Sequence, residues 1–123
     1  MNTPNYIVAN RLNYLLNTKS IAELKLDETN LVSKFAEFVK GSKELNTYGY
    51  SLLFSGQTEK ALYVFDLNSK LFPYNHNVYD SLGEAYLKVE HPKEALKNYY
   101  KILSLNPENK NARDMVEKIK NNI

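Results

Sequence analysis

The sequence predicts an all-α protein built as a stack of antiparallel helix hairpins, an α-solenoid. Three observations favour this fold: a 34-residue internal repeat, apolar residues spaced as on one face of a helix, and few residues that break helices. The 123 residues include only four glycines and four prolines, which is typical of long elements joined by short turns. A hydrophobic content of 43% is enough for a core, and the length is that of one domain.

The internal repeat becomes visible when the sequence is compared with itself at an offset of 34 residues. Glycine, alanine and proline coincide, and these are residue types with strict steric roles. The identical pairs are Gly49 and Gly83, Leu53 and Leu87, Ala61 and Ala95, Leu62 and Leu96, Leu71 and Leu105, Pro73 and Pro107, and Asn75 and Asn109. We therefore expect two equivalent helix pairs, over 42–75 and 76–109.

Residues 1–41 lie outside this register but also favour helices. Thr3-Pro4 is predicted to open a helix that runs to about Asn17, and Ser20 with Glu23 forms a capping-box pair for a short helix. Asp27 is predicted to cap a longer helix that ends at Gly41. The sequence leaves open whether this N-terminal extension is a degenerate repeat or a separate addition. Its apolar faces consist of Val8, Leu12 and Leu15, then of Leu31, Phe35, Phe38 and Val39.

The first repeat unit, residues 42–75, carries its own start and stop signals. Ser42 is predicted to cap a helix that runs to about Ser55, and Gly56 suits the left-handed position that follows a helix. Thr58 is predicted to cap a second helix, and Pro73 prevents its continuation.

The second unit, residues 76–109, repeats this arrangement. Asn77 is predicted to cap a helix with Asp80 in its first turn, where a carboxylate suits the positive end of the helix dipole. That helix should end near Val89. Pro92 fits the first position of the next helix, and Pro107 follows its end.

Residues 110–123 continue the register as one more helix, the cap helix, which would cover the last repeat. Two glycines inside the repeat helices predict close packing. Gly49 and Gly83 fall mid-helix, where glycine costs roughly 0.5–1 kcal/mol relative to alanine. We expect Ala61 and Ala95 to be the small residues that face them.

Residues 42–109 resemble the tetratricopeptide repeat, whose pattern is W-x2-L-G-x2-Y, then A-x3-F, then P. Leucine and tyrosine replace the tryptophan and keep its apolar character. The resemblance implies noncatalytic protein–protein interaction, in which a peptide or partner protein binds the concave face of the stack. The matching residues are Leu45, Tyr48, Gly49, Leu52, Ala61, Phe65 and Pro73, then Tyr79, Leu82, Gly83, Tyr86, Ala95, Tyr99 and Pro107.

The stretches 45–53 and 77–86 are also similar to tetratricopeptide segments appended to bacterial serine hydrolases and esterases. This similarity implies an alternative function, that of a structural, oligomerisation or accessory module. The hydrolase chemistry does not carry over, because neither Ser-x-x-Lys nor Gly-x-Ser-x-Gly occurs in the chain. We therefore predict that the protein is not an enzyme and needs no cofactor.

Composition argues against several other classes. Sixteen basic and fourteen acidic residues are evenly spread, which predicts no nucleic-acid partner. With no cysteine, and with His76 and His91 alone in predicted turns, no metal site is expected. No apolar run approaches the ~20 residues of a membrane span, and the start resembles no secretory signal, so we expect a cytoplasmic protein without a membrane partner.

The resemblance also implies where a partner would bind. The family's clamp for a terminal carboxylate uses lysine, asparagine and arginine, whereas Asp80 and Glu84 here would repel a carboxylate. We expect a neutral or basic segment instead, with the partner's identity unknown and a homodimer left open. The predicted concave-face residues are Asn46, Tyr50, Leu53, Phe54, Asn77, Asp80, Ser81, Glu84 and Lys88.

The first repeat contributes Tyr50, Leu53 and Phe54 to this face, whereas the second contributes mainly polar residues. An apolar patch of this kind is usually a binding site or a buried contact. Because the N-terminal extension joins the first repeat directly at Gly41 and Ser42, we expect its Leu31–Val39 stripe to cover the apolar part.

Overall fold

The computed structural model describes residues 6–123, which form eight helices and no strand. The predicted all-α architecture is therefore confirmed. The helices are α1 (Tyr6–Thr18), α2 (Ile21–Leu26), α3 (Glu28–Ala36), α4 (Lys43–Phe54), α5 (Thr58–Leu71), α6 (His76–Lys88), α7 (Pro92–Leu105) and α8 (Lys110–Lys120).

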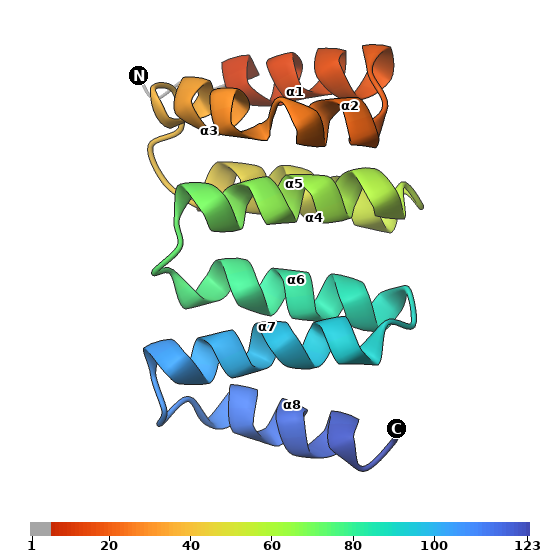
Figure 1. Cartoon of the computed structure of the whole chain (residues 1–123), viewed down its shortest axis with the longest axis vertical. Helices are drawn as coiled ribbons and strands as arrows, with labels where there is room; N and C mark the ends of the chain where they lie inside the picture. Colours follow the sequence, from red (N-terminus) through yellow and green to blue (C-terminus); the bar gives the residue numbers. More distant parts are fainter. Residues whose placement is uncertain (1–5) are drawn as a thin grey trace.

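The helices lie in successive layers along the long axis of the molecule (Figure 1). The most extensive contacts join α4 to α5 and α6 to α7, which are the two predicted hairpins. Consecutive layers meet where α5 packs on α6 and α7 packs on α8. At the N-terminal end, α1 packs on α4, while α2 and α3 pack on α5. The layer of α1, α2 and α3 therefore continues the stack, and α8 lies at its other end.

One hydrophobic core runs through all of these layers. Leu12 of α1, Leu45 of α4, Leu67 of α5, Tyr99 of α7 and Val116 of α8 all belong to it. Most helices contribute members at three- and four-residue spacing, as expected for helices that bury one face, whereas α5 packs on α4, α6, α2 and α3 and is buried on several sides. The stack is thus held together by apolar contacts from end to end.

The helix caps in the second unit differ from the prediction. Helix α6 begins at His76, and its cap is Asn75, whose Oδ1 accepts a hydrogen bond from the Asn77 backbone N–H at 2.9 Å. Asn109 caps α8 in the same way, by accepting from the Ala112 backbone N–H at 2.9 Å. Asn77 is therefore not the cap, and no acidic residue lies in the first turn of α6. Asn75 and Asn109 are identical repeat positions, so the repeat itself marked the true caps.

The predicted caps of the first unit are also wrong in detail. Thr58 is the first residue of α5, and Gln57 before it makes no side-chain capping bond. Ser42 precedes α4 without capping it, and its Oγ accepts from Asn75 Nδ2 at 3.0 Å. The Ser42 carbonyl accepts from Nδ2 of the buried Asn68 at 2.9 Å. These bonds tie the start of α4 to α5 and to the turn before α6.

In the N-terminal extension, the capping box is confirmed. The Glu23 backbone N–H donates to Ser20 Oγ at 3.1 Å, and the Ser20 N–H donates to Glu23 Oε1 at 3.0 Å. Asp27 precedes α3 but makes no side-chain capping bond, and α3 ends at Ala36 rather than at Gly41. The predicted start at Thr3-Pro4 lies outside the described residues.

The two mid-helix glycines are buried, and each lies directly against an aromatic ring. A Cβ on Gly49 would lie 2.7 Å from Cδ1 of Phe65, and one on Gly83 would lie 2.6 Å from Cε2 of Tyr99. The prediction of close packing therefore holds, and the atoms nearest to a Cβ at each glycine belong to the aromatic residue one turn after Ala61 or Ala95. Each glycine makes room for an aromatic ring of the second helix in its own hairpin.

Candidate functional site

The candidate site is the surface where the first helices of the hairpins lie side by side. Helix α4 packs on α6, and Asn111 of α8 contacts α6 in turn. Of the nine predicted site residues, seven are at least partly exposed. We call the surface formed by these seven and Asn111 the first-helix face. Its residues are Asn46, Tyr50 and Phe54 of α4, Asn77, Asp80, Glu84 and Lys88 of α6, and Asn111 of α8.

Hydrogen bonds join these helices across the face. The Tyr50 hydroxyl donates to Glu84 Oε2 at 2.5 Å, across an interval of 34 residues. Asn111 Nδ2 lies 3.5 Å from Asp80 Oδ1, which links α8 to α6. The first bond joins equivalent positions of successive repeats, so the helices lie in register and hold the polar groups at defined places.

An exposed aromatic ring stands beside these polar groups. The Phe54 side chain is 74% exposed, and its ring stacks on Tyr50 with centroids 5.8 Å apart and an interplanar angle of 22°. Lys88 Nζ lies 5.4 Å from the centroid of the Phe54 ring, within the range of a cation–π contact. Tyr50 in turn packs edge-on against the buried Phe65 ring, with centroids 5.0 Å apart. Phe54 is thus exposed but anchored on a rigid support.

The electrostatics of the face follow from partial burial and from two nearby carboxylates. Burial raises the pKa of Asp80, the neighbouring Glu84 carboxylate raises it further, and His76 opposes the shift. Burial, together with the hydrogen bond to Glu84, raises the pKa of Tyr50 to about 12. Tyr50 therefore remains a hydrogen-bond donor throughout the physiological range, and Asp80 is a carboxylate whose charged form lacks full solvation.

Two predicted site residues do not reach the surface. Leu53 is buried in the core at 3% exposure and cannot contact a partner. Ser81 is equally buried, and its Oγ donates a hydrogen bond to Asn46 Oδ1 between α6 and α4. The helical period placed both residues near the face, but each falls on the side of its helix that packs against a neighbour.

The expectation that the N-terminal extension covers this face is also wrong. Phe54 remains mostly exposed. Phe35 is buried, but its helix α3 packs on α5. It is α1 that packs on α4. The apolar part of the first-helix face is therefore open within the described structure.

Sequence analysis did not identify an apolar hollow beside this face. It has a volume of about 380 Å³, and Leu87 of α6 and Met115 of α8 contribute to its lining. Pro92, Ile119 and Ile123 complete its apolar wall. The spacing of the apolar residues of α8 was the available signal, but the sequence did not show that α8 would lie beside the end of α6.

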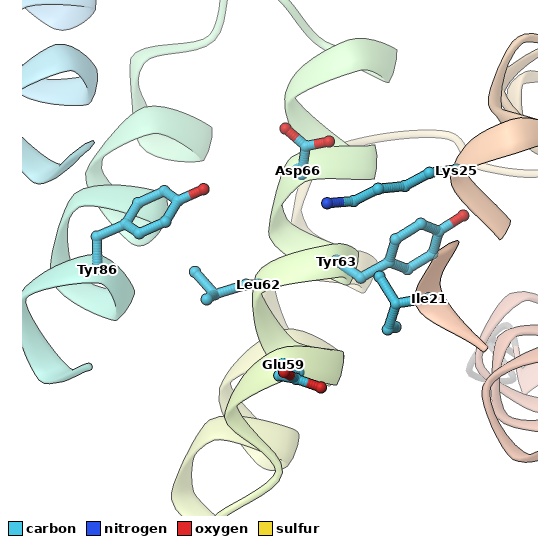
Figure 2. Close-up of a pocket in the computed structure, with 7 residues that line it drawn as sticks. All are labelled: Ile21, Lys25, Glu59, Leu62, Tyr63, Asp66 and Tyr86. Atoms are coloured by element: carbon cyan, nitrogen blue, oxygen red, sulfur yellow. The ribbon is translucent and has the colours of Figure 1, made fainter. Parts of the chain in front are cut away.

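A separate hollow of about 270 Å³ lies between α2, α5 and α6. Figure 2 shows the Lys25 ammonium group extending from α2 toward α5 near Asp66, and the Tyr86 hydroxyl pointing toward α5 from the side of α6. Asp66 already accepts from Lys70 Nζ at 2.7 Å, and the same ammonium group lies 2.6 Å from Glu28 Oε1. The Lys70–Glu28 pair links α5 to α3, and the Lys70–Asp66 pair, within α5, engages one carboxylate of this hollow.

Neither site shows the constellation of a metal centre or a membrane segment. Among residues 6–123 no group of three or more histidine, cysteine or acidic side chains is placed to hold a metal ion. Within the same range no helix is long and apolar enough to span a bilayer. The chain matches no protein-family model and none of the curated proteins with which it was compared.

Proposed function

We propose that the chain is a tetratricopeptide-repeat protein and acts as a noncatalytic protein–protein interaction module. Its two hairpins place glycine against an aromatic ring at equivalent positions, and each second hairpin helix ends shortly before a proline. These features support the family assignment. The partner binds the first-helix face as an extended or helical segment of a protein, and no residue has a catalytic role.

One observation carries the choice of this face. Phe54 is a large, exposed aromatic side chain that is held in place by Tyr50, and Tyr50 also bonds Glu84. Aromatic residues with a rigid support are typical energetic centres of protein interfaces. Asp80 and Glu84 lie on α6, beside α4 on this face, and favour a basic residue in the partner. The bound segment therefore combines an apolar side chain, which packs on Phe54, with a lysine or arginine near the two carboxylates.

This proposal can be tested by phage display. Peptides from a random library are selected for binding to the immobilised full chain. We expect the selected sequences to be enriched in lysine or arginine close to an apolar residue. Phe54→Ala should weaken their binding by at least about fivefold, since hot-spot truncations cost more than ~1 kcal/mol. Glu84→Gln should weaken it in the same direction, because the change removes one of the two carboxylates.

Tyr100→Ala is the matched control, because Tyr100 is 47% exposed but belongs to α7. Binding that survives both face variants, or that is lost equally with the control, would contradict the proposal. Light scattering after size exclusion addresses the oligomerisation alternative. A dimer that dissociates on the Phe54→Ala change would identify the first-helix face as a self-association surface instead.

A further inference from the structure

A groove of about 610 Å³ lies between α1 and α3, in the layer at the N-terminal end of the stack (Figure 1). Residues from α4 to α8 take no part in its lining. It is therefore distinct from the first-helix face, and its occupation is independent of the function proposed above. The residues that matter for its chemistry are Arg11, Tyr14 and Leu15 of α1, and Leu31, Lys34 and Phe35 of α3.

The centre of the groove is apolar. Leu31 and Phe35 are 6% and 1% exposed and form its floor, while Leu15 is half-buried beside them. Tyr14 is 66% exposed at the rim. A trough between two helices with an apolar floor is the form that accepts the apolar face of an amphipathic helix.

The rim of the groove is positively charged. Arg11 and Lys34 are its only charged lining residues, and neither makes an ion pair with any residue from 6 to 123. Arg11 lies 5.5 Å from the Phe38 ring centroid, so its guanidinium is held near the groove. The described part of α1 contains no acidic residue. Asp27 and Glu37 flank α3, and Glu28 is its first residue, but none of the three lines the groove, and Glu28 is engaged by Lys70.

We propose that this groove docks an acidic amphipathic helix of a partner protein, which would pack against α1 and α3. The apolar stripe of that helix would pack on Tyr14 and the half-buried Leu15, above the buried floor of Leu31 and Phe35, and flanking carboxylates would pair with Arg11 and Lys34. A second copy of this chain is a poor occupant. Its α8, the helix at the opposite end, carries four basic and two acidic residues and would oppose the charge of the rim.

Two labelled peptides of about 15 residues, long enough for four helical turns, test the proposal by fluorescence anisotropy with the full chain. Both carry the same leucine stripe, and the other positions are glutamate in one and glutamine in the other, because a lysine peptide would also suit the carboxylates of the first-helix face. We expect the glutamate peptide to bind roughly tenfold more tightly, because each charge contact with the rim contributes up to about 1 kcal/mol. The double variant Arg11→Glu/Lys34→Glu should reverse this preference.

The matched control is Lys93→Glu, which reverses an exposed charge on α7, outside both the groove and the first-helix face, and should leave the preference unchanged. All of these side chains are exposed, and melting curves establish that each variant is folded. Equal affinity for the two peptides, or a preference unaffected by the double variant, would overturn the proposal. A dimer in light scattering that Tyr14→Glu dissociates would also overturn it, in favour of a second copy as the occupant.

Discussion

Gly83 sets the distance between the two helices of its hairpin. A Cβ at this position would lie 2.6 Å from Cε2 and 2.7 Å from Cζ of Tyr99, whose ring is 1% exposed. Because the interior is close-packed, the ring has little room to retreat. Gly49 meets Phe65 in the same way in the preceding hairpin. The cost of glycine within a helix is thus offset by the burial of an aromatic side chain against the helix backbone.

We expect Gly83→Ala to lower the free energy of unfolding by about 1–3 kcal/mol, the usual cost of overpacking. The gain in helix propensity, about 1 kcal/mol, reduces this loss without reversing it. Gly83→Leu should cost more than Gly83→Ala. Urea denaturation measures all three proteins, with Gly41→Ala as the control, because no atom lies within 4 Å of a Cβ at Gly41. Equal stability of Gly83→Ala and the wild type would contradict this account of the hairpin.

Glu90 adopts a backbone conformation that favours glycine. Its φ is 62°, and it follows α6 at the position where Gly56, with a φ of 83°, follows α4. A side chain with a Cβ is disfavoured there by roughly 1–2 kcal/mol. We expect Glu90→Gly to raise the free energy of unfolding by up to about 1 kcal/mol, since the added freedom of the unfolded chain removes part of the gain.

Glu90→Ala separates the backbone effect from the side-chain effect in thermal melts. Alanine keeps the Cβ, so its melting temperature should stay close to that of the wild type. If alanine and glycine stabilise the chain equally, the removal of the glutamate side chain explains the gain and the backbone account fails.

Among the single elements, α8 shields the outer face of the second hairpin from solvent. Ala112, Val116 and Ile119 are buried where α8 packs on α7, while the rest of α8 is largely polar and exposed. The helix thereby covers the outer face of the second repeat and presents charge to solvent, as a terminal element of a solenoid must. Its cap residue, Asn109, fixes where it begins.

We expect removal of residues 110–123 to cost about 3 kcal/mol or more, because burial of Val116 and Ile119 alone is worth roughly 1.5–3 kcal/mol each. The truncated chain should aggregate or melt at a clearly lower temperature in calorimetry. Val116→Asp tests the same contact within the full chain, and Glu117→Ala on the exposed side is its control. A truncated chain with the melting curve of the full protein would show that α8 does not protect the stack.

The sequence predicted the ends of the helices better than their caps or the burial of individual residues. Helix ends near proline were placed to within a residue or two, because proline excludes the next helical hydrogen bond whatever its surroundings. Caps were harder to place, since Asn75 and Asn77 are both suitable by type and only the coincidence of Asn75 with Asn109 in the repeat favours the true cap. The burial of Leu53 and Ser81 was likewise missed, because helical spacing gives a direction around a helix and not the position of its neighbours.

For the molecule as a whole, the register of the repeats produces the candidate site. The Tyr50–Glu84 bond spans 34 residues, and so does the contact of Lys88 with Phe54. Equivalent positions of successive helices therefore meet, and a surface forms that no single hairpin contains. The same register places Asp80 and Glu84 close together on α6. Two carboxylates close together on one partly buried face repel each other, which supports the proposal of a partner that brings positive charge.

The cost of keeping the Asp80 carboxylate charged in the folded chain should be measurable as a dependence of the free energy of unfolding on pH. Burial and the nearby Glu84 raise the pKa of Asp80 in the folded chain above its unfolded value of about 3.8, against a smaller opposing effect of His76. Between these two pKa values the folded state binds more protons than the unfolded state, so the contribution of Asp80 to stability falls as the pH rises through that interval.

Asp80→Asn should therefore unfold at a higher urea concentration than the wild type at pH 7, and the difference should vanish below about pH 4, where Asp80 is protonated in both states. Asp114→Asn is the control, because Asp114 is exposed on α8 and pairs only with Lys110, at 2.9 Å, a contact worth ~1 kcal/mol at most. Urea titrations of the three proteins from pH 3 to pH 8 measure the effect. If Asp80→Asn is no more stable than the wild type at pH 7, the Asp80 carboxylate is not under strain in the free chain, and its attraction for a basic partner would have to rest on Coulomb forces alone.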